Sequence, residues 1–161
     1  SNDETNIVLG TGGSGETKRV PSKIFIEVMK NTVKKRKCKF FIATGNTKEE
    51  KEILDQITKS DLKEFCIPLN NLNISKVIPI IKNCNVAICN DSSFSHLSAA
   101  LNIPTIVLMA DTPLVYGSYS SLMHPILPEG AKTVSHDTLG KDKINPSEVQ
   151  KKLDEILSNI F

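Results

Sequence analysis

One stretch of the chain has the residue types of a phosphate-binding helix start: Asn90-Asp91-Ser92-Ser93-Phe94-Ser95-His96. Asp91 or Ser92 can cap a helix that begins at the next residue. The backbone N–H groups of Ser92, Ser93 and Phe94 would then be open to an anion. His96 follows Ser92 by four residues, shares its helix face and can donate to a phosphate oxygen. A plain helix cap with a structural His fits the same spacing, so the residues alone leave both interpretations open.

A glycine-rich turn near the start of the chain is a second candidate: Gly10-Thr11-Gly12-Gly13-Ser14-Gly15. Glycines let the backbone approach a ligand, and we expect Gly12, Gly13 and Ser14 to contact one. The turn is not a P-loop, because no Gly-Lys-Ser/Thr follows at the required spacing. Lys18 and Arg19 come just before a predicted helix start, where cations beside free N–H groups suit an anion. A flexible turn and a solvated pair of cations are the alternatives.

A third candidate runs from Ala110-Asp111-Thr112-Pro113 to Tyr116-Gly117, after an apolar run. Ligands of parallel α/β sheets lie beyond the carboxyl ends of the strands, so we expect Thr112 to face the same ligand. An ordinary proline-containing turn is the alternative.

The elements that must position these segments alternate along the chain. Short apolar runs predict five strands and a sixth at an edge: Asn6–Leu9, Lys39–Thr44, Glu64–Ile67, Val86–Cys89, Thr105–Met109 and Pro125–Leu127. Helical spacing of apolar residues predicts five helices: one from about Pro21, Glu49–Thr58, Ile74–Ile81, Ser93–Leu101, and one after Asn145 whose apolar stripe ends at Ile160. Pro79 should kink or shorten the third. This alternation predicts a parallel, Rossmann-like sheet with helices on both sides.

The composition suits one soluble globular domain, with 161 residues, 39% hydrophobic and 24% charged. A net charge of +2 does not indicate a nucleic-acid partner, and no apolar run approaches the roughly 20 residues that span a bilayer. The cysteines form no C-x-x-C pair, so we expect neither zinc nor disulfides, and a reducing cytoplasm is the natural setting: Cys38, Cys66, Cys84 and Cys89. Residues 1–4 lack a signal-peptide pattern, and we expect them to be a tag remnant or linker.

Six cations crowd the end of the first predicted helix: Lys30, Lys34, Lys35, Arg36, Lys37 and Lys39. Cations favour helix C-termini, which explains most of this basic run. Basic clusters also attract anionic lipid, so a peripheral membrane contact is the alternative.

Two motifs stand in order along the chain. Lys18-Arg19-Val20-Pro21 follows the glycine-rich turn, and Asn90-Asp91-Ser92-Ser93-Phe94-Ser95-His96-Leu97-Ser98-Ala99-Ala100-Leu101 follows the fourth predicted strand. They resemble the Lys-Arg/His-Trp-Pro and N-D-S/T-G-x-x-H-L-A-A-A-L elements of glycosyltransferase family 9, the lipopolysaccharide heptosyltransferases. Val20 stands where the family has Trp, and Ser93 stands where it has Gly, which narrows the approach to a phosphate or adds a hydroxyl donor.

The resemblance continues into the next elements. Asn102-Ile103-Pro104-Thr105 and Asp111-Thr112-Pro113 are similar to the family's Pro-led strand and Thr-x-Pro loop. It covers the chain from Ile7 to about Leu127 and is confined to the C-terminal half of the family's proteins.

The resemblance implies that the chain is one half of a GT-B fold: residues 1–161 would be the C-terminal nucleotide-sugar-binding domain, without the N-terminal acceptor domain. It implies an inverting transfer, by default of heptose from ADP-heptose, to a lipopolysaccharide or lipooligosaccharide core. The acceptor would be a lipid-linked saccharide bound by the missing domain. The mechanism that the family implies needs no metal, and we expect no cofactor. We expect a cytoplasmic enzyme; a membrane contact, the alternative for the basic run, would be peripheral and at the inner face of the inner membrane.

The resemblance also assigns roles to residues. Lys18 and Asp91 would be catalytic, with the general base in the missing domain, so we expect this chain alone to bind nucleotide weakly and transfer nothing. Lys18, the helix dipole and backbone N–H groups would stabilise the charge of the leaving diphosphate. The resemblance carries Lys18, Asp91, Ser92, Ser93 and His96 into donor binding. From their place in the three candidate segments, we expect the donor to be bound also by Gly12, Gly13, Ser14, Arg19, Phe94 and Thr112.

Two other functions remain open on these residues. One is a non-catalytic nucleotide-binding α/β module. The other is a different GT-B enzyme, such as a nucleotide-sugar epimerase, for which Glu16 and His124 are the extra catalytic candidates.

Overall fold

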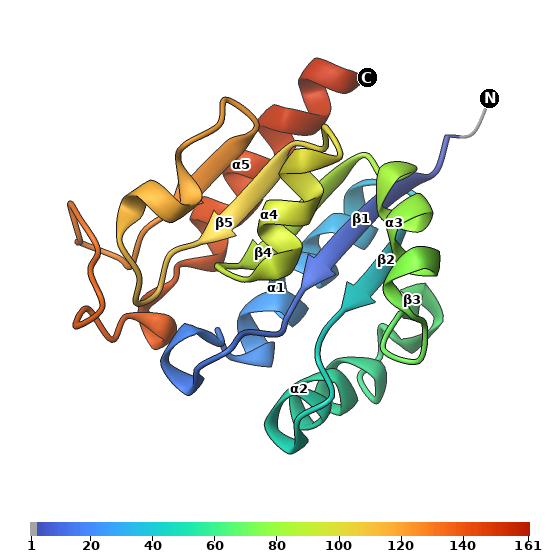
Figure 1. Cartoon of the computed structure of the whole chain (residues 1–161). Coiled ribbons are helices and arrows are strands. Elements are labelled where there is room, and N and C mark those ends of the chain that lie inside the picture. Colours follow the sequence, from blue (N-terminus) through green and yellow to red (C-terminus); the bar gives the residue numbers. More distant parts are fainter. Residues whose placement is uncertain (1–2) are drawn as a thin grey trace.

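Six parallel strands form one sheet in the computed structural model, which describes residues 3–161, and their order is β3-β2-β1-β4-β5-β6 (Figure 1). The strands are β1 Thr5–Gly10, β2 Cys38–Ala43, β3 Cys66–Pro68, β4 Val86–Asn90, β5 Thr105–Leu108 and β6 Met123–Ile126. The order reverses between β1 and β4, and ligands of such sheets bind at that point, beyond the carboxyl ends. The predicted Rossmann-like sheet is confirmed. Ser1 and Asn2, part of the expected tag remnant or linker, lie outside the described residues.

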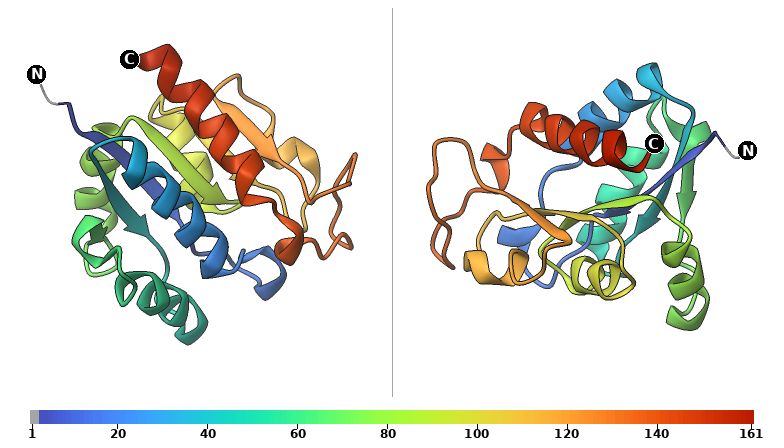
Figure 2. Two further views of the ribbon diagram at one scale, coloured as in Figure 1. Left: turned by 180° about the vertical axis from the view of Figure 1, so that it is seen from behind. Right: turned by 90° about the horizontal axis from the view of Figure 1, so that it is seen from above.

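Helices cover both faces of the sheet, which gives three layers (Figure 2). They are α1 Ser22–Lys35, α2 Lys48–Thr58, α3 Ile74–Lys82, α4 Ser93–Ala100 and α5 Pro146–Ile160, with 3-10 helices η1 Glu16–Lys18, η2 Lys63–Phe65, η3 Leu114–Gly117 and η4 Lys141–Lys143. Residues of α1, α2 and α5 pack with Ile7 and Leu9 of β1, whereas α3 and α4 pack on the other face with Val8. Alternate residues of β1 thus enter opposite layers, as the strand period requires.

The strand register brings the predicted site segments to one edge of the sheet. Gly10, the last residue of β1, pairs with Ala43 at the end of β2 and with Cys89 of β4. Asn90 pairs with Leu108, the last residue of β5. The loops after these four strands therefore begin side by side.

The predicted third strand, Glu64–Ile67, is wrong in its first two residues. The Phe65 amide donates to the Leu62 carbonyl at 2.9 Å, so this part of the chain forms the 3-10 turn η2. The strand begins only at Cys66, where the chain pairs with Phe40 of β2.

Two helices differ in detail from the prediction. Helix α3 continues through Pro79, and its buried face carries Val77 and Ile81. Helix α5 starts as predicted, because the Asn145 side chain accepts from the Ser147 amide at 2.9 Å. Ile160, the last residue of the predicted stripe, lies in the last turn and is 44% exposed.

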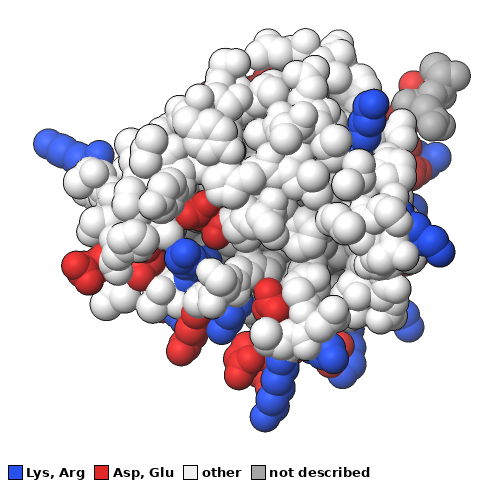
Figure 3. Space-filling model, viewed as in Figure 1, with Lys and Arg blue, Asp and Glu red and all other residues white. Residues whose placement is uncertain are grey.

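Charged side chains are unevenly distributed: on the face seen in Figure 3 they gather along the lower and right margins, and the middle is largely uncharged. The basic run lies at the amino edge of the sheet, because α1 leads into the start of β2. Several of its cations are engaged within the chain: Lys35 with Asp154, Lys37 with Glu4, and Lys39 with the Glu64 carbonyl. Over residues 3–161 no helix has the length and apolar character that a membrane crossing requires. The peripheral membrane contact stays a prediction.

Candidate functional site

A cavity of about 300 Å³ opens at the carboxyl ends of β1, β2 and β4. Its lining comes from the loops that follow these strands and from the first turns of α2 and α4: Gly12, Gly13, Ser14, Arg19, Gly45, Thr47, Glu50, Ser92, Ser93 and Phe94. We call this cavity the edge pocket. Seven of the eleven residues predicted to bind the donor line it, whereas Lys18, Asp91, His96 and Thr112 do not.

The start of α4 gives the edge pocket an anion-binding character. Ser92 is the N-cap, and its amide donates to the Ser95 hydroxyl at 3.3 Å. The Ser93 and Phe94 amides, by contrast, donate to no group of residues 3–161. Unpaired N–H groups at a helix start carry partial positive charge, so they suit a phosphate.

Asn90 ties the glycine-rich loop to the end of β4. Its side-chain nitrogen donates to the carbonyls of Thr11 at 3.1 Å and Gly12 at 3.2 Å, and its side-chain oxygen accepts from the Val20 amide at 3.3 Å. Asn90 is fully buried, so these bonds satisfy backbone groups that water cannot reach. We therefore assign Asn90 to positioning the loop; the sequence placed it in the motif but gave it no role.

Arg19 lines the edge pocket together with the glycine-rich loop. Its Nη1 donates to the Gly13 carbonyl at 2.9 Å, and the remaining guanidinium donors have no partner in the described part of the chain. Lys18 lies in η1, half-buried and outside the lining, and its ammonium makes no ion pair or hydrogen bond within residues 3–161. Of the two predicted cations, Arg19 therefore lines the edge pocket, and Lys18 does not.

Glu50 is a pocket residue that the sequence reasoning missed. Its buried carboxylate accepts from the Gly13 amide at 3.0 Å, and from the Thr47 hydroxyl at 2.9 Å and amide at 3.2 Å. Burial alone would raise the pKa of Glu50, but these bonds and one from the Gly45 amide outweigh it and hold that pKa below its usual 4.5. The Thr47-x-x-Glu50 capping box was visible in the sequence, but it indicates a helix start and not this contact.

In the part of the chain that the structure describes, buried hydroxyls without hydrogen-bond partners collect at the same edge of the sheet. They are Thr11 after β1, Thr44 after β2, Ser92 after β4 and Thr112 after β5; one more, Ser98, lies on α4. Such groups are uncommon in native proteins, since burial without a hydrogen bond costs free energy. Three of the four follow strands whose loops lead into the edge pocket, so this edge of the sheet offers polar groups that a ligand could bind.

His96 is not placed as expected. Its Nδ1 lies 2.6 Å from the Tyr119 hydroxyl and its Nε2 lies 3.4 Å from Asp91 Oδ1, so the imidazole faces these residues instead of the pocket. Thr112 is fully buried, and the neighbouring Asp111 accepts from the Leu139 amide at 2.7 Å. The loop after β5 is therefore tied to the segment around Leu139 by this hydrogen bond.

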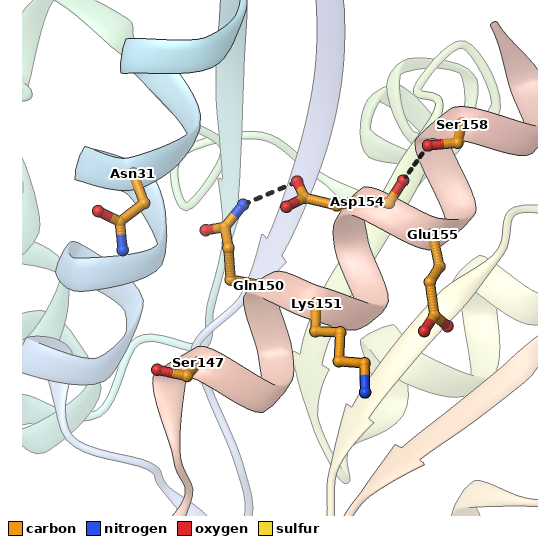
Figure 4. Close-up of a pocket in the computed structure, with 7 residues that line it drawn as sticks. All are labelled: Asn31, Ser147, Gln150, Lys151, Asp154, Glu155 and Ser158. Atoms are coloured by element: carbon orange, nitrogen blue, oxygen red, sulfur yellow. Dashed lines mark hydrogen bonds between the residues drawn. The ribbon is translucent and has the colours of Figure 1, made fainter.

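A second groove, about 540 Å³ in volume, lies between α1 and α5 (Figure 4). Its polar groups bond to one another: Gln150 donates to Asp154 at 3.1 Å, and Ser158 donates to the Asp154 carbonyl at 2.7 Å. It contains no residue of the loops that follow the strands. We therefore treat the edge pocket as the candidate site.

Glu16 and His124 were the extra catalytic candidates for a nucleotide-sugar epimerase. Glu16 pairs with Lys141 at 3.5 Å, and its side chain is 82% exposed. His124 lies in β6, where burial and the nearby Lys152 lower its pKa. Neither lines the edge pocket. Among residues 3–161, no group of three or more His, Cys, Asp or Glu side chains is arranged to hold a metal ion.

Comparison with known proteins gives two curated relatives. The chain is 35% identical over 75 residues to lipooligosaccharide heptosyltransferase 2 of Haemophilus influenzae, covering 45% of this chain and 22% of the relative. It is 26% identical over 141 residues to lipopolysaccharide heptosyltransferase 1 of Campylobacter coli, covering 86% of this chain and 41% of the relative. The chain thus spans less than half the length of these proteins.

Solved structures show the same architecture. Escherichia coli heptosyltransferase WaaC with ADP superposes with a TM-score of 0.78 at 15% identity, over 97% of this chain and 45% of that one. ADP-heptose LPS heptosyltransferase II of E. coli has a TM-score of 0.78 at 20% identity, over 99% and 48%. At these identities the likeness establishes the fold alone. It confirms the prediction that the chain has the fold of one half of a GT-B protein.

The family is established by the sequence as a whole. The model of glycosyltransferase family 9 (heptosyltransferase) matches residues 2–135, well over half of the chain. This is the family that the two sequence motifs resemble. The chain belongs to glycosyltransferase family 9, the heptosyltransferases.

Proposed function

We propose that the edge pocket binds the diphosphate and ribose of a nucleotide sugar, and that the chain is the donor-binding domain of an inverting heptosyltransferase. The observation that carries this proposal is the start of α4: Ser93 and Phe94 line the edge pocket, and their amides have no hydrogen-bond partner in residues 3–161. A helix start with free amides, next to a guanidinium, binds diphosphate without a dedicated metal.

The other wall suits a group rich in hydroxyls. Glu50 follows β2 and lines the pocket with a carboxylate that accepts from the Gly13 amide. In nucleotide-binding α/β sheets an acidic residue beyond the second strand binds ribose hydroxyls. We assign that role to Glu50, so the phosphates would lie toward α4 and the nucleoside toward α2.

Family membership supports ADP-heptose as the donor, and the solved relative with ADP supports the adenine nucleotide. The acceptor is a lipid-linked saccharide of the lipopolysaccharide or lipooligosaccharide core, held by a part of the enzyme that this chain does not contain. That part also supplies the general base. The chain alone is therefore expected to bind nucleotide and to transfer nothing.

In the assembled enzyme, negative charge builds on the diphosphate as the sugar leaves. Arg19, Lys18 and the free amides of α4 would stabilise that charge, in place of a metal ion. Asp91, the predicted catalytic carboxylate, lies just before the N-cap, outside the pocket lining, with Oδ1 3.4 Å from His96 Nε2; its direct contact with the donor stays a prediction. Reaction takes place at the cytoplasmic face of the membrane in this proposal, with the acceptor's lipid in the bilayer.

Titration with ADP, UDP and GDP, followed by thermal unfolding, tests the donor site. Ligand binding stabilises the folded state by RT ln(1 + [L]/Kd), so the preferred nucleotide gives the largest shift. Arg19→Gln should weaken ADP binding about tenfold, because it removes charged hydrogen bonds. Arg36→Gln, which removes the chain's other Arg at the far edge of the sheet, should leave ADP binding unchanged. Absence of a shift with all three nucleotides would overturn the proposal.

A further inference from the structure

The imidazole of His96 sits between a phenol and a buried carboxylate. Its Nδ1 lies 2.6 Å from the Tyr119 hydroxyl, and the two rings stack with 9° between their planes. Its Nε2 lies 3.4 Å from Oδ1 of Asp91, whose side chain is only 8% exposed. Tyr119 was singled out by no motif, and it lies 23 residues from His96 in the sequence.

These neighbours determine where the imidazole carries its proton. A carboxylate oxygen near Nε2 favours a proton on that nitrogen, because the contact is otherwise between two lone pairs. Nδ1 of the neutral ring is then an acceptor, and the Tyr119 hydroxyl donates to it. The hydrogen bond from Tyr119 therefore selects the form of His96 that is favourable beside Asp91.

The loop after β5 is shaped to bring Tyr119 to this place. Gly117, at the end of η3, is buried, and a Cβ there would collide with the Met109 sulfur and lie 3.2 Å from Val107. Glycine thus lets η3 lie directly on β5 and its extension. The chain leaves that contact two residues before Tyr119, whose ring reaches across to α4.

We propose that Tyr119 is a positioning residue of the donor site, acting through His96 on Asp91. This rests on the proposed function, since it assumes a diphosphate at the start of α4. Asp91 directly precedes Ser92, and a free carboxylate there would repel a phosphate at the Ser93 and Phe94 amides. The His96 Nε2–H, fixed by Tyr119, holds the carboxylate turned to the imidazole and offsets part of its charge.

Tyr119→Phe tests this role, because it keeps the stacked ring and removes only the hydroxyl. Tyr119 is 58% exposed, so the variant should fold like the parent chain. Two measurements apply: the ¹⁵N resonances of the His96 imidazole at pH 8, without nucleotide, and the Kd for ADP. We expect one protonated nitrogen, Nε2, in the parent chain and a larger share of the Nδ1-protonated form in the variant, where only Asp91 still favours a proton on Nε2. ADP should bind about threefold more weakly, as expected for the loss of one hydrogen bond.

Tyr116→Phe is the matched control. Tyr116 lies on the same loop and is 45% exposed, but its ring is tilted against His136, with centroids 6.4 Å apart. Its hydroxyl should affect neither the His96 resonances nor ADP binding. An equal effect of both substitutions would overturn the positioning role, since it would point to a general effect on the loop.

The remaining outcomes separate this inference from the proposed function. If the parent chain binds ADP and Tyr119→Phe binds it equally well, the positioning role is overturned and the donor site stands. The same holds if the His96 resonances change while ADP affinity does not. A parent chain that binds no nucleotide overturns the donor site and the role of Tyr119 with it.

Discussion

The Glu50 carboxylate accepts a hydrogen bond from the Gly13 amide at 3.0 Å, which joins α2 to the loop after β1 across 37 residues of sequence. The close approach depends on glycine on both sides of the carboxylate. A Cβ at Gly12 would lie 2.6 Å from Glu50 Oε1, and one at Gly45 would collide with Oε2. The acid thus holds two glycine loops while lining the edge pocket, so its substitution should affect both stability and binding.

Glu50→Gln should lower the free energy of unfolding by about 1–3 kcal/mol at pH 7, because an amide cannot accept from both the Gly13 and Thr47 donors. Urea denaturation measures the loss. Glu49→Gln, at the exposed neighbouring position, should change stability by less than about 0.5 kcal/mol. Equal stability of Glu50→Gln and the parent chain would show that the carboxylate contacts contribute nothing.

The effect of Glu50 should depend on pH in a defined direction. Its pKa in the folded chain lies below the usual 4.5, so the charged form stabilises the fold at any pH above that usual value. The contribution falls as pH drops from about 4.5 through the folded-state pKa. The stability difference between the parent chain and Glu50→Gln should therefore be constant from pH 6 to 7.5 and shrink below about pH 4.5. A difference that grows in acid would contradict the lowered pKa.

Ser93→Asp should weaken ADP binding about tenfold or more, because it places a negative charge at the first residue of α4, beside the free amides. The same substitution should not destabilise the helix, since acidic residues are favourable in a first turn. Ser147→Asp, in the first turn of α5, adds the same charge at another helix start and should leave ADP binding unchanged. Calorimetric titration of ADP into both variants checks the pair. Similar affinities for the two variants would place the phosphates elsewhere.

The sequence predicted the parts of this architecture that depend on neighbours along the chain. The helix start after β4 could be read from Asp91 to His96, because caps and free amides are local features. The contact of Glu50 with Gly13 and that of Tyr119 with His96 could not, since both join residues far apart in sequence. Such contacts depend on strand order and register, which periodicity does not determine.

The direction of the His96 side chain could not be predicted either. Spacing placed it on the face of Ser92, but the phenol of Tyr119 and the carboxylate of Asp91 hold its ring aside. The buried Asn90 shows the opposite case. Its place in the motif was visible, and only the structure shows that it satisfies the Thr11 and Gly12 carbonyls.

Asn90→Asp should destabilise the chain by about 2–4 kcal/mol at pH 7. The carboxylate cannot donate to the Thr11 and Gly12 carbonyls, and it would place a buried charge beside them. Asn85→Asp is a suitable control, because the Asn85 side chain accepts from the Asn6 amide and a carboxylate can do the same. Urea denaturation of both variants should show a large loss only at position 90. A small loss there would mean that the loop carbonyls find other donors.

Gly10→Ala should destabilise the chain by about 1–3 kcal/mol through overpacking. A Cβ at Gly10 would lie 2.6 Å from the Cys89 sulfur and 2.8 Å from its Cβ, where β1 and β4 pair at the edge of the sheet. Gly15→Ala is the control, because Gly15 has extended backbone angles and no atom within 4 Å of the added methyl group.

Cys89→Ala removes the nearer of the two obstacles to the Gly10 methyl group and leaves the other. The double variant Gly10→Ala/Cys89→Ala should therefore lose less stability than the sum of the single variants, by about 0.5 kcal/mol or more. Urea denaturation of the three variants and the parent chain gives this coupling directly. Strict additivity would show that the strain of Gly10→Ala lies in the backbone of β1 and not in its contact with β4.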